Sequence, residues 1–284
     1  PAPTRPQLLW GRFRRRPVGV LSAVLCIVVL LFAAFGPWLA PQDPFKTSIR
    51  ERLHPPSIEH ALGTDELGRD LASRIIFGAQ STLSVGLMAV AFACVVGTVL
   101  VILAAMSRVW ISTMIMRATD LMLAFPWFLL ILTIVSVLGP GLENVILALS
   151  VAMVPHYIRL ARGLALSVRE REFVQAAVLI GESPFSVQTR YILPNCASPL
   201  LVQVTLDIPI TIMAAAALGF LGLGAQPPMP EWGAMLSGAR EYMLTDPHVV
   251  VAPALALVLV TLAFNLLGDT MRDVLDPRTE DVVR

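Results

Sequence analysis

Charged residues are scarce in this chain. Aspartate, glutamate, lysine and arginine make up 14% of its 284 residues, whereas soluble domains carry roughly 25%. Hydrophobic residues make up 56%, and the mean hydropathy is +0.74. This balance excludes an ordinary soluble domain and indicates an integral membrane protein.

Lysine is almost absent: it occurs once, as Lys46, after Phe45. A phosphate-binding P-loop needs Gly-Lys-Ser/Thr after a glycine-rich turn, and this chain contains no such sequence. The glycines at 219, 222 and 224 do not follow the dinucleotide-binding order either. We therefore expect a chain that is not an enzyme, with no catalytic residues and no cofactor of its own. If ATP drives its function, ATP and Mg belong to separate ATPase chains.

Cysteine and histidine are also few. The three cysteines lie far apart and the four histidines lack the spacing of metal ligands, so the sequence predicts neither a disulfide framework nor a metal site. The net charge is +1, and no basic surface interleaved with aromatic residues is visible. We expect no nucleic-acid partner.

Long apolar runs are abundant, and a membrane-spanning helix needs about 20 such residues. The first run could instead be a secretory signal, but the apolar region of a signal covers only about 7–15 residues, so we interpret it as an uncleaved span. Pro126 falls inside the third run, where neighbouring helices or water can satisfy the freed carbonyl. Gly139-Pro140-Gly141 is expected to break the chain before the fourth. The sequence predicts an all-α membrane protein with six spans, near 18–35, 83–105, 114–137, 142–162, 197–220 and 249–267.

The basic residues are distributed unevenly between the loops. With the N-terminus inside, 15 of the 21 lysines and arginines fall on the inner side. The positive-inside rule then places both termini and the segment around 158–195 in the cytoplasm. The chain is thereby divided into a cytoplasmic tail (1–17), a first span with an extracytoplasmic segment (18–78), a core of five spans (79–268) and a second cytoplasmic tail (269–284).

Two local predictions concern charged residues near the membrane surface. Asp65 or Asp70 is expected to cap a short helix lying along that surface. Arg117 and Asp120, near the start of the third span, are expected to form an ion pair.

The longest polar interruption between apolar runs covers residues 167–194 and predicts two short helices joined by a tight turn. Ser167 and Glu170 would form a capping box, and Gly181 would end the first helix in a left-handed conformation. Ser183 and Pro184 would begin the second helix. It would end at Leu193-Pro194. The apolar side of the first helix is predicted to hold Phe173, Val174, Ala177 and Ile180.

The spacing of Gln175-Ala176-Ala177, Gly181 and Tyr191-Ile192-Leu193-Pro194 resembles the EAA loop of permease subunits of ABC importers. In that family the loop is a coupling helix that docks into a groove on a cytoplasmic ATPase. Gln175 stands where glutamate is usual, so no salt bridge to the ATPase is expected there, and Tyr191 stands where an aliphatic residue is usual. The small residues at 176, 177 and 181 are expected to let the partner's backbone approach closely. The coupling residues implied by the resemblance are Glu172, Gln175, Ala176, Ala177, Gly181, Leu193 and Pro194.

Further segments extend the resemblance, at 63–78, 117–126, 160–177, 220–236 and 264–278. They are similar to signatures of the second, C-type, permease subunit of dipeptide, oligopeptide and nickel importers of the bacterial inner membrane. The resemblance implies a type I ABC importer transmembrane domain that works by alternating access. It also implies four kinds of partner: a sister permease in a heterodimer, two ABC ATPase subunits, an extracytoplasmic peptide-binding protein and the lipid bilayer.

Two other functions are alternatives to peptide import. A permease for nickel or another small solute has the same architecture, but no metal-ligand cluster favours it. A secondary transporter would show inverted repeats with broken helices in matched positions, and the sequence shows none. Peptide is therefore the preferred cargo.

Polar residues at four-residue spacing, Gln203, Asp207 and Thr211, interrupt the fifth span. A carboxylate facing lipid at mid-bilayer costs about 2.5–3.5 kcal/mol on insertion scales, so such a group usually faces a cavity or a partner. Pro209 is expected to kink the helix there. We interpret this stripe as lining the passage at the heterodimer interface; the alternative is an Asp207 that is protonated or paired with the sister subunit for structural reasons.

Overall fold

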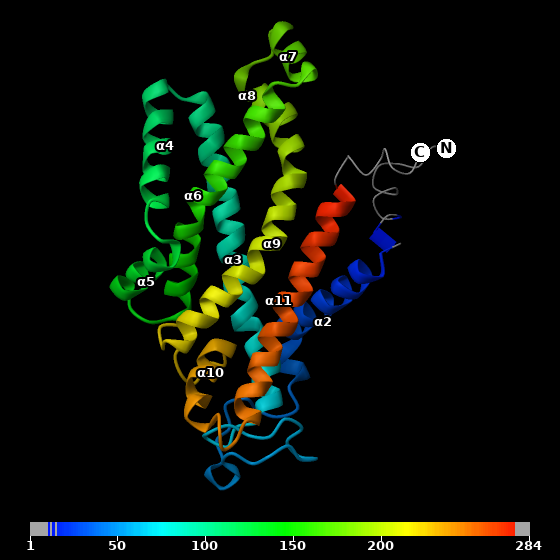
Figure 1. Cartoon of the computed structure of the whole chain (residues 1–284), viewed down its shortest axis with the longest axis vertical. Coiled ribbons are helices and arrows are strands. Elements are labelled where there is room, and N and C mark those ends of the chain that lie inside the picture. Colours follow the sequence, from blue (N-terminus) through cyan, green and yellow to red (C-terminus); the bar gives the residue numbers. More distant parts are fainter. Residues whose placement is uncertain (1–10, 12, 15, 276–284) are drawn as a thin grey trace.

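The computed structural model describes residues 11, 13, 14 and 16–275. Within these residues every regular element is helical, and the helices form an elongated bundle (Figure 1). Five helical segments are long and apolar enough to span a membrane. The predicted tails fall partly outside the described residues, since 1–10 and 276–284 are not covered. The five segments are α2 (Pro17–Leu39), α3 (Leu71–Met106), α6 (Leu142–Arg169), the run Pro184–Phe220 that contains α9 (Leu193–Phe220), and α11 (His248–Leu275).

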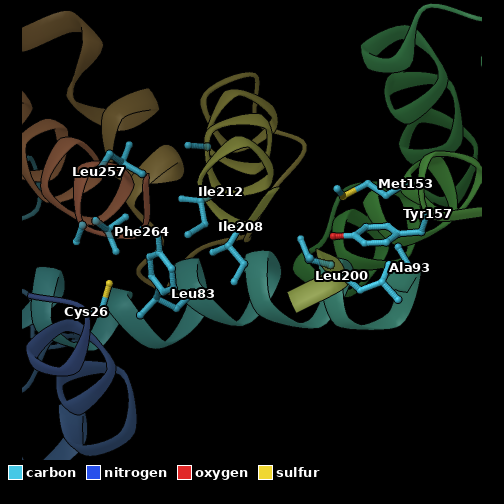
Figure 2. Close-up of a cluster of buried hydrophobic side chains, with 14 of the residues drawn as sticks. Cys26, Leu83, Ala93, Met153, Tyr157, Leu200, Ile208, Ile212, Leu257 and Phe264 are labelled. Atoms are coloured by element: carbon cyan, nitrogen blue, oxygen red, sulfur yellow. The ribbon is translucent and has the colours of Figure 1, made fainter. Parts of the chain in front are cut away.

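The helix α3 is the centre of the bundle and packs against α2, α6 and α9. Two glycines on α3 allow this close approach, as expected for small residues at helix interfaces in membranes. A Cβ on Gly86 would lie 2.6 Å from Ile212 of α9, and one on Gly97 would lie 2.7 Å from Tyr157 of α6. Figure 2 shows the core between these helices, where Leu83 of α3 faces Ile208 and Phe264.

The predicted continuous third span is wrong. Two helices, α4 (Val109–Leu123) and α5 (Trp127–Leu138), occupy this stretch and meet at 94°. Pro126 lies directly before α5 with ψ of 121°, and its nitrogen cannot donate the hydrogen bond that would continue α4. The proline therefore ends the helix instead of being accommodated within it, and the sixth span exists only if the bent pair crosses as one unit.

The predicted ion pair between Arg117 and Asp120 is also replaced. Asp120 of α4 accepts a hydrogen bond from Arg159 of α6 at 3.0 Å. Both side chains are at least half exposed, so the pair contributes only about 0–1 kcal/mol to stability. Its structural effect is to connect α4 to α6.

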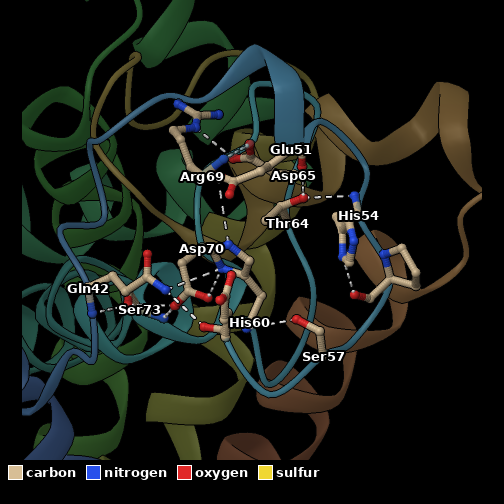
Figure 3. Close-up of polar contacts among 12 residues, drawn as sticks. Gln42, Glu51, His54, Ser57, His60, Thr64, Asp65, Arg69, Asp70 and Ser73 are labelled. Carbon is tan, nitrogen blue, oxygen red and sulfur yellow. Dashed lines mark hydrogen bonds and ion pairs between the residues drawn. The ribbon is translucent and has the colours of Figure 1, made fainter.

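The segment between α2 and α3 folds around buried charges at the end of the bundle opposite α7 (Glu172–Leu179) (Figures 1 and 3). The Asp65 carboxylate accepts a hydrogen bond from Arg69 Nε at 2.6 Å and lies 3.2 Å from Arg74 Nε. All three side chains are buried. Burying one member of such a network without the others costs about 3–5 kcal/mol, so this cluster holds the segment in a single arrangement.

Asp70 caps a helix, as one of the two expected alternatives, but the capped helix is the long α3, and residues 63–70 directly before it form no short helix. Its carboxylate accepts a hydrogen bond from the Ser73 backbone N–H at 2.8 Å and lies 3.0 Å from His60 Nδ1. Gly68 has φ of +72°, and a Cβ there would lie 1.8 Å from the Ser48 carbonyl oxygen. The motif at 63–78 is therefore a structural support for the start of α3.

A short helix, α10 (Trp232–Ala239), folds back against α9 and α11 at the same end. Glu231 caps it by accepting hydrogen bonds from the backbone N–H groups of Gly233 and Ala234, each at 2.8 Å. The carboxylate is buried, and burial raises its pKa despite these bonds. Trp232 Nε1 donates to the Ile75 carbonyl oxygen at 3.0 Å, so α10 is attached to α3 as well.

Candidate functional site

The segment predicted as a helical hairpin lies at the end of the bundle opposite the segment between α2 and α3 (Figure 1). Its first helix is α7 (Glu172–Leu179), which has eight residues. The predicted capping box is wrong, because α6 continues through Ser167 to Arg169. Arg171 stands at the start of α7 without a side-chain cap. The long α6 thus carries the hairpin directly, with a turn of only two residues.

The turn after α7 has the predicted left-handed glycine. Gly181 has φ of +87°. Its N–H donates to the Val178 carbonyl, and the Glu182 N–H donates to the Ala177 carbonyl, each at 3.1 Å. These two bonds define a Schellman motif, which orders the end of the helix and fixes the direction in which the chain returns.

The second helix of the hairpin begins as predicted but does not end at Leu193-Pro194. Ser183 Oγ accepts a hydrogen bond from the Ser186 N–H, and Pro184 occupies the first turn. The short α8 (Pro184–Ser186) then continues through a π-helical turn, Val187–Ile192, into α9. Pro194 lies in the first turn of α9, where its missing N–H costs little. The hairpin is therefore continuous with a helix that reaches Phe220.

The buried face of α7 is narrower than the sequence predicts. Val174 and Ala177 are 1% and 3% exposed, and Val174 packs in the same core cluster as Val187 and Ile192 of the π-helical turn. Phe173 and Ile180, expected on this face, are exposed. Ala177 is turned into the hairpin, so it cannot serve as a thin outer flank for a partner.

Large apolar side chains instead cover the outside of the hairpin. Leu179 and Ile180 are 86% and 78% exposed, and their neighbours are also open to solvent. Exposed apolar groups gathered at one tip mark an interaction surface. The sequence signal was present, because an ordinary amphipathic helix would not end in Val-Leu-Ile. We call this surface the apolar tip: Phe173, Val178, Leu179, Ile180 and Phe185.

The remaining residues implied by the resemblance lie around the tip. Glu172, Gln175, Ala176 and Gly181 are exposed, as is Pro194, whereas Leu193 is partly buried. Gln175 Nε2 donates to the carbonyl oxygen of Glu170 at 3.0 Å. A glutamate at 175 could not donate this bond, so the glutamine fastens the start of α7 to the end of α6.

The polar stripe of α9 is brought together but faces inward. Gln203 Nε2 donates to Asp207 Oδ1 at 2.9 Å, and Thr211 Oγ1 lies 3.2 Å from the Met153 sulfur of α6. Asp207 and Thr211 are 5% and 0% exposed. In this conformation Thr211 is part of the α6–α9 contact and not the wall of an opening, so its role in a passage stays a prediction.

A sequence model described as "Binding-protein-dependent transport system inner membrane component" matches residues 97–281, about two thirds of the chain. The chain belongs to this family. A second model, described as the N-terminal transmembrane domain of oligopeptide transport permease C, matches residues 4–56. This permease subunit is therefore a multi-pass protein of the inner membrane, in a family whose transport systems include an ATPase and a substrate-binding protein.

Curated relatives agree with this assignment. The chain is 44% identical over 270 residues to the glutathione transport system permease protein GsiD of Escherichia coli O6:K15:H31 (strain 536 / UPEC), covering 95% of the chain and 89% of the relative. The GsiD protein of Shigella boydii serotype 4 (strain Sb227) gives the same values. The likeness extends across nearly the whole permease.

The arrangement of the helices is that of a type I ABC importer transmembrane domain. A solved chain of the methionine ABC transporter MetNI, in an inward-facing conformation, matches with a TM-score of 0.59 at 18% identity. The match covers 72% of this permease and 97% of the solved chain. At that identity the likeness establishes the fold alone.

Proposed function

We propose that this permease subunit imports di- or oligopeptides by alternating access, driven by ATP hydrolysis on separate ATPase chains. The cargo is inferred from the relative named as a glutathione permease and from the match to an oligopeptide permease segment. Nickel or another small solute is the second candidate, and no group of three or more candidate metal ligands occurs in the described part of the chain to favour it.

The observation that carries the coupling role is the position of the apolar tip. Four of its five residues lie on or next to α7, which packs against the π-helical turn of a helical run, Pro184–Phe220, that extends into the core of the bundle. A partner that moves the tip therefore moves α9 with it, because packed helices transmit displacement as rigid bodies. We infer that the ATPase covers the tip. Glu172, Gln175, Ala176 and Gly181 form the polar or small margin of this contact, with Leu193 and Pro194 where the run enters α9.

The remaining partners follow from the same proposal. A sister permease completes the passage as a heterodimer, two ABC ATPases hold ATP and Mg, and an extracytoplasmic binding protein delivers the peptide. The excess of arginine on the hairpin side supports a cytoplasmic position for the hairpin and both termini. ATPase docking requires that side.

A reconstituted importer tests this proposal. The chain with its sister permease, ATPases and binding protein should accumulate labelled dialanine or trialanine in vesicles only when ATP is supplied. Leu179→Arg should leave the two permeases paired while the ATPases no longer co-purify and uptake is lost. Leu244→Arg is the control, because Leu244 is 94% exposed but lies in the stretch between α10 and α11.

The outcomes separate the parts of the proposal. Uptake of nickel without uptake of peptide would replace the cargo while keeping the mechanism. Wild-type ATPase association and uptake in Leu179→Arg would show that the apolar tip is not the coupling surface.

A further inference from the structure

A cavity of about 430 Å³ lies beside the base of the hairpin, between the end of α3, the start of α4, the end of α6 and the π-helical turn. Figure 1 shows that α3 ends and α4 begins at the hairpin end of the bundle. The volume is within the usual range for small-ligand sites, about 300–1,000 Å³. Neither the apolar tip nor the polar stripe of α9 lines this cavity, so coupling and passage leave it without a function.

Two arginines of α6, Arg162 and Arg169, line the cavity. They are seven residues apart, so their positions around the helix axis differ by only about 20°. Within the described residues neither guanidinium takes part in an ion pair or a hydrogen bond, and no aspartate or glutamate lines the cavity. Two cations that face one cavity repel each other. A bound anion would remove that repulsion.

Neutral polar groups lie in the same wall as the arginines. Ser107, Ser112 and Gln188 line the cavity, and their side chains make no hydrogen bond to another residue in the part of the chain that the structure describes. The helix α4 also begins in this wall, at Val109, without a side-chain cap. The N–H groups and the positive dipole end of a helix N-terminus favour an anion. The polar part of the cavity thus offers hydrogen-bond donors and positive charge, which a phosphate group binds.

The rest of the lining is largely apolar and lies deeper in the bundle. Val101 comes more than one turn before the end of α3, and Ile158 about three turns before the end of α6. Ile115 stands more than one turn into α4, and Arg162 lies one turn from Ile158 on the side of the hairpin. The cavity therefore changes from polar at the hairpin end to apolar toward the middle of the membrane.

We propose that this cavity binds one anionic phospholipid from the leaflet on the hairpin side. Arg162 and Arg169 hold the headgroup phosphate, and the first part of an acyl chain lies along Val101 and Ile158. Basic pockets between membrane helices suit lipid headgroups, and the guanidinium fork matches the geometry of a phosphate. A free phosphate ion or a carboxylate of the ATPase would use only the polar end, so the apolar end favours the lipid. Under the orientation proposed above, this leaflet is the cytoplasmic one.

Lipid retention by the assembled permease–ATPase complex tests this site. The complex is released from nanodiscs of equal parts phosphatidylglycerol and phosphatidylcholine, and the lipids it retains are counted by native mass spectrometry. Phosphatidylcholine carries the same phosphate beside a cation, which the two arginines repel. The wild type should therefore prefer phosphatidylglycerol by about 10-fold or more. Replacing both arginines, Arg162→Gln with Arg169→Gln, should abolish the preference, and replacing both with lysine should keep most of it.

Arg190→Gln is the matched control. Arg190 is an exposed arginine of the π-helical turn that does not line the cavity, so this variant should keep the preference. Arg162 and Arg169 are exposed as well, so the glutamine variants should assemble, and co-purification of the ATPases checks this. If the double variant does not assemble, Arg169→Gln alone should lower the preference by about 5-fold.

Several outcomes would overturn the lipid site. They are equal retention of both lipids by the wild type, an unchanged preference in the double variant, and an equal loss in Arg190→Gln. Inorganic phosphate tests the other source of the same group. If calorimetry in pure phosphatidylcholine nanodiscs shows that it binds the wild type and not the double variant, the occupant is a free anion and the lipid assignment is wrong. Peptide import stands or falls independently of these results.

Discussion

The side-chain amide of Gln175 donates a hydrogen bond of 3.0 Å to the backbone carbonyl of Glu170, and so joins α7 to the end of α6. This bond exists because the chain has glutamine where the resembling loops have glutamate. The glutamine side chain supplies an N–H donor at this position, where an ionised glutamate could only accept a hydrogen bond. The attachment of α7 in this permease therefore depends on a residue that departs from the family pattern.

Gln175→Glu should loosen α7. The substitution removes the donor, and one such bond contributes about 0.5–1.5 kcal/mol. Hydrogen exchange at the amides of α7 should become faster, while the spans keep their protection. Glu172→Gln changes the charge of the same helix without touching the bond and serves as the control. Equal exchange in wild type and Gln175→Glu would mean that the bond does not hold α7.

The destabilisation caused by substituting Gly181 should depend on how well the new residue tolerates a positive φ. Nothing lies within 4 Å of a Cβ built there, so backbone conformation alone sets the penalty. Gly181→Ala should cost about 1–2 kcal/mol, and Gly181→Asn less, because asparagine tolerates this conformation. Exchange of the Glu182 amide, which donates to Ala177, measures the effect. Alanine equal to glycine at this amide would contradict the prediction.

Arginine should disrupt the hairpin at position 177 but not at position 176. Ala177 is 3% exposed and packs inside, so Ala177→Arg must expel α7 from the π-helical turn. Ala176 is exposed, so Ala176→Arg should leave α7 folded and act only on a docked partner. Limited proteolysis of the hairpin separates the two, with rapid cleavage expected only for Ala177→Arg. Similar resistance in both variants would argue against the observed orientation of α7.

Gly219→Ala should displace α10. The new Cβ would lie 2.4 Å from Glu231 Oε2 and 3.0 Å from the Ala234 nitrogen, and overpacking of this kind costs about 1–3 kcal/mol. Gly163→Ala on α6 is the control, because open space surrounds its Cβ. The thermal unfolding midpoint of the purified complex should fall for Gly219→Ala and not for Gly163→Ala. A drop of equal size in both would exclude the steric explanation.

Glu231 should make stability decrease as pH rises. Burial raises its pKa in the folded state above the ordinary value of 4.5, so the folded protein holds this proton when the unfolded chain has released it. The free energy of unfolding therefore falls as pH rises from 4.5 through the folded-state pKa, and is lower by a constant amount above it. Glu231→Gln cannot titrate, so its unfolding midpoint minus that of the wild type should grow from pH 4.5 upward. A constant difference would show that Glu231 does not contribute to the slope.

Composition and periodicity determined much of this protein. Long apolar runs can be satisfied only by helices in a bilayer, and the spans at α2, α3, α6, α9 and α11 follow from that constraint. The left-handed turn at Gly181 was also predictable, because its signal is local and glycine adopts that conformation without a steric penalty. The position of the hairpin was predictable from the family motifs for the same reason, because the spacing of their residues can be read directly from the sequence.

Only the tertiary structure decided the features that depend on contacts between residues far apart in the sequence. Pro126 could be accommodated in a span or could end one, and only the packing of α5 on α6 shows that it ends α4. Asp120 had a sequence neighbour in Arg117 but pairs with Arg159, because α6 places that guanidinium 3.0 Å away. Periodicity does not predict the buried face of α7, because a helix of eight residues has too few turns to fix its orientation. Its contact with the π-helical turn fixes that orientation, burying Ala177 and exposing Ile180.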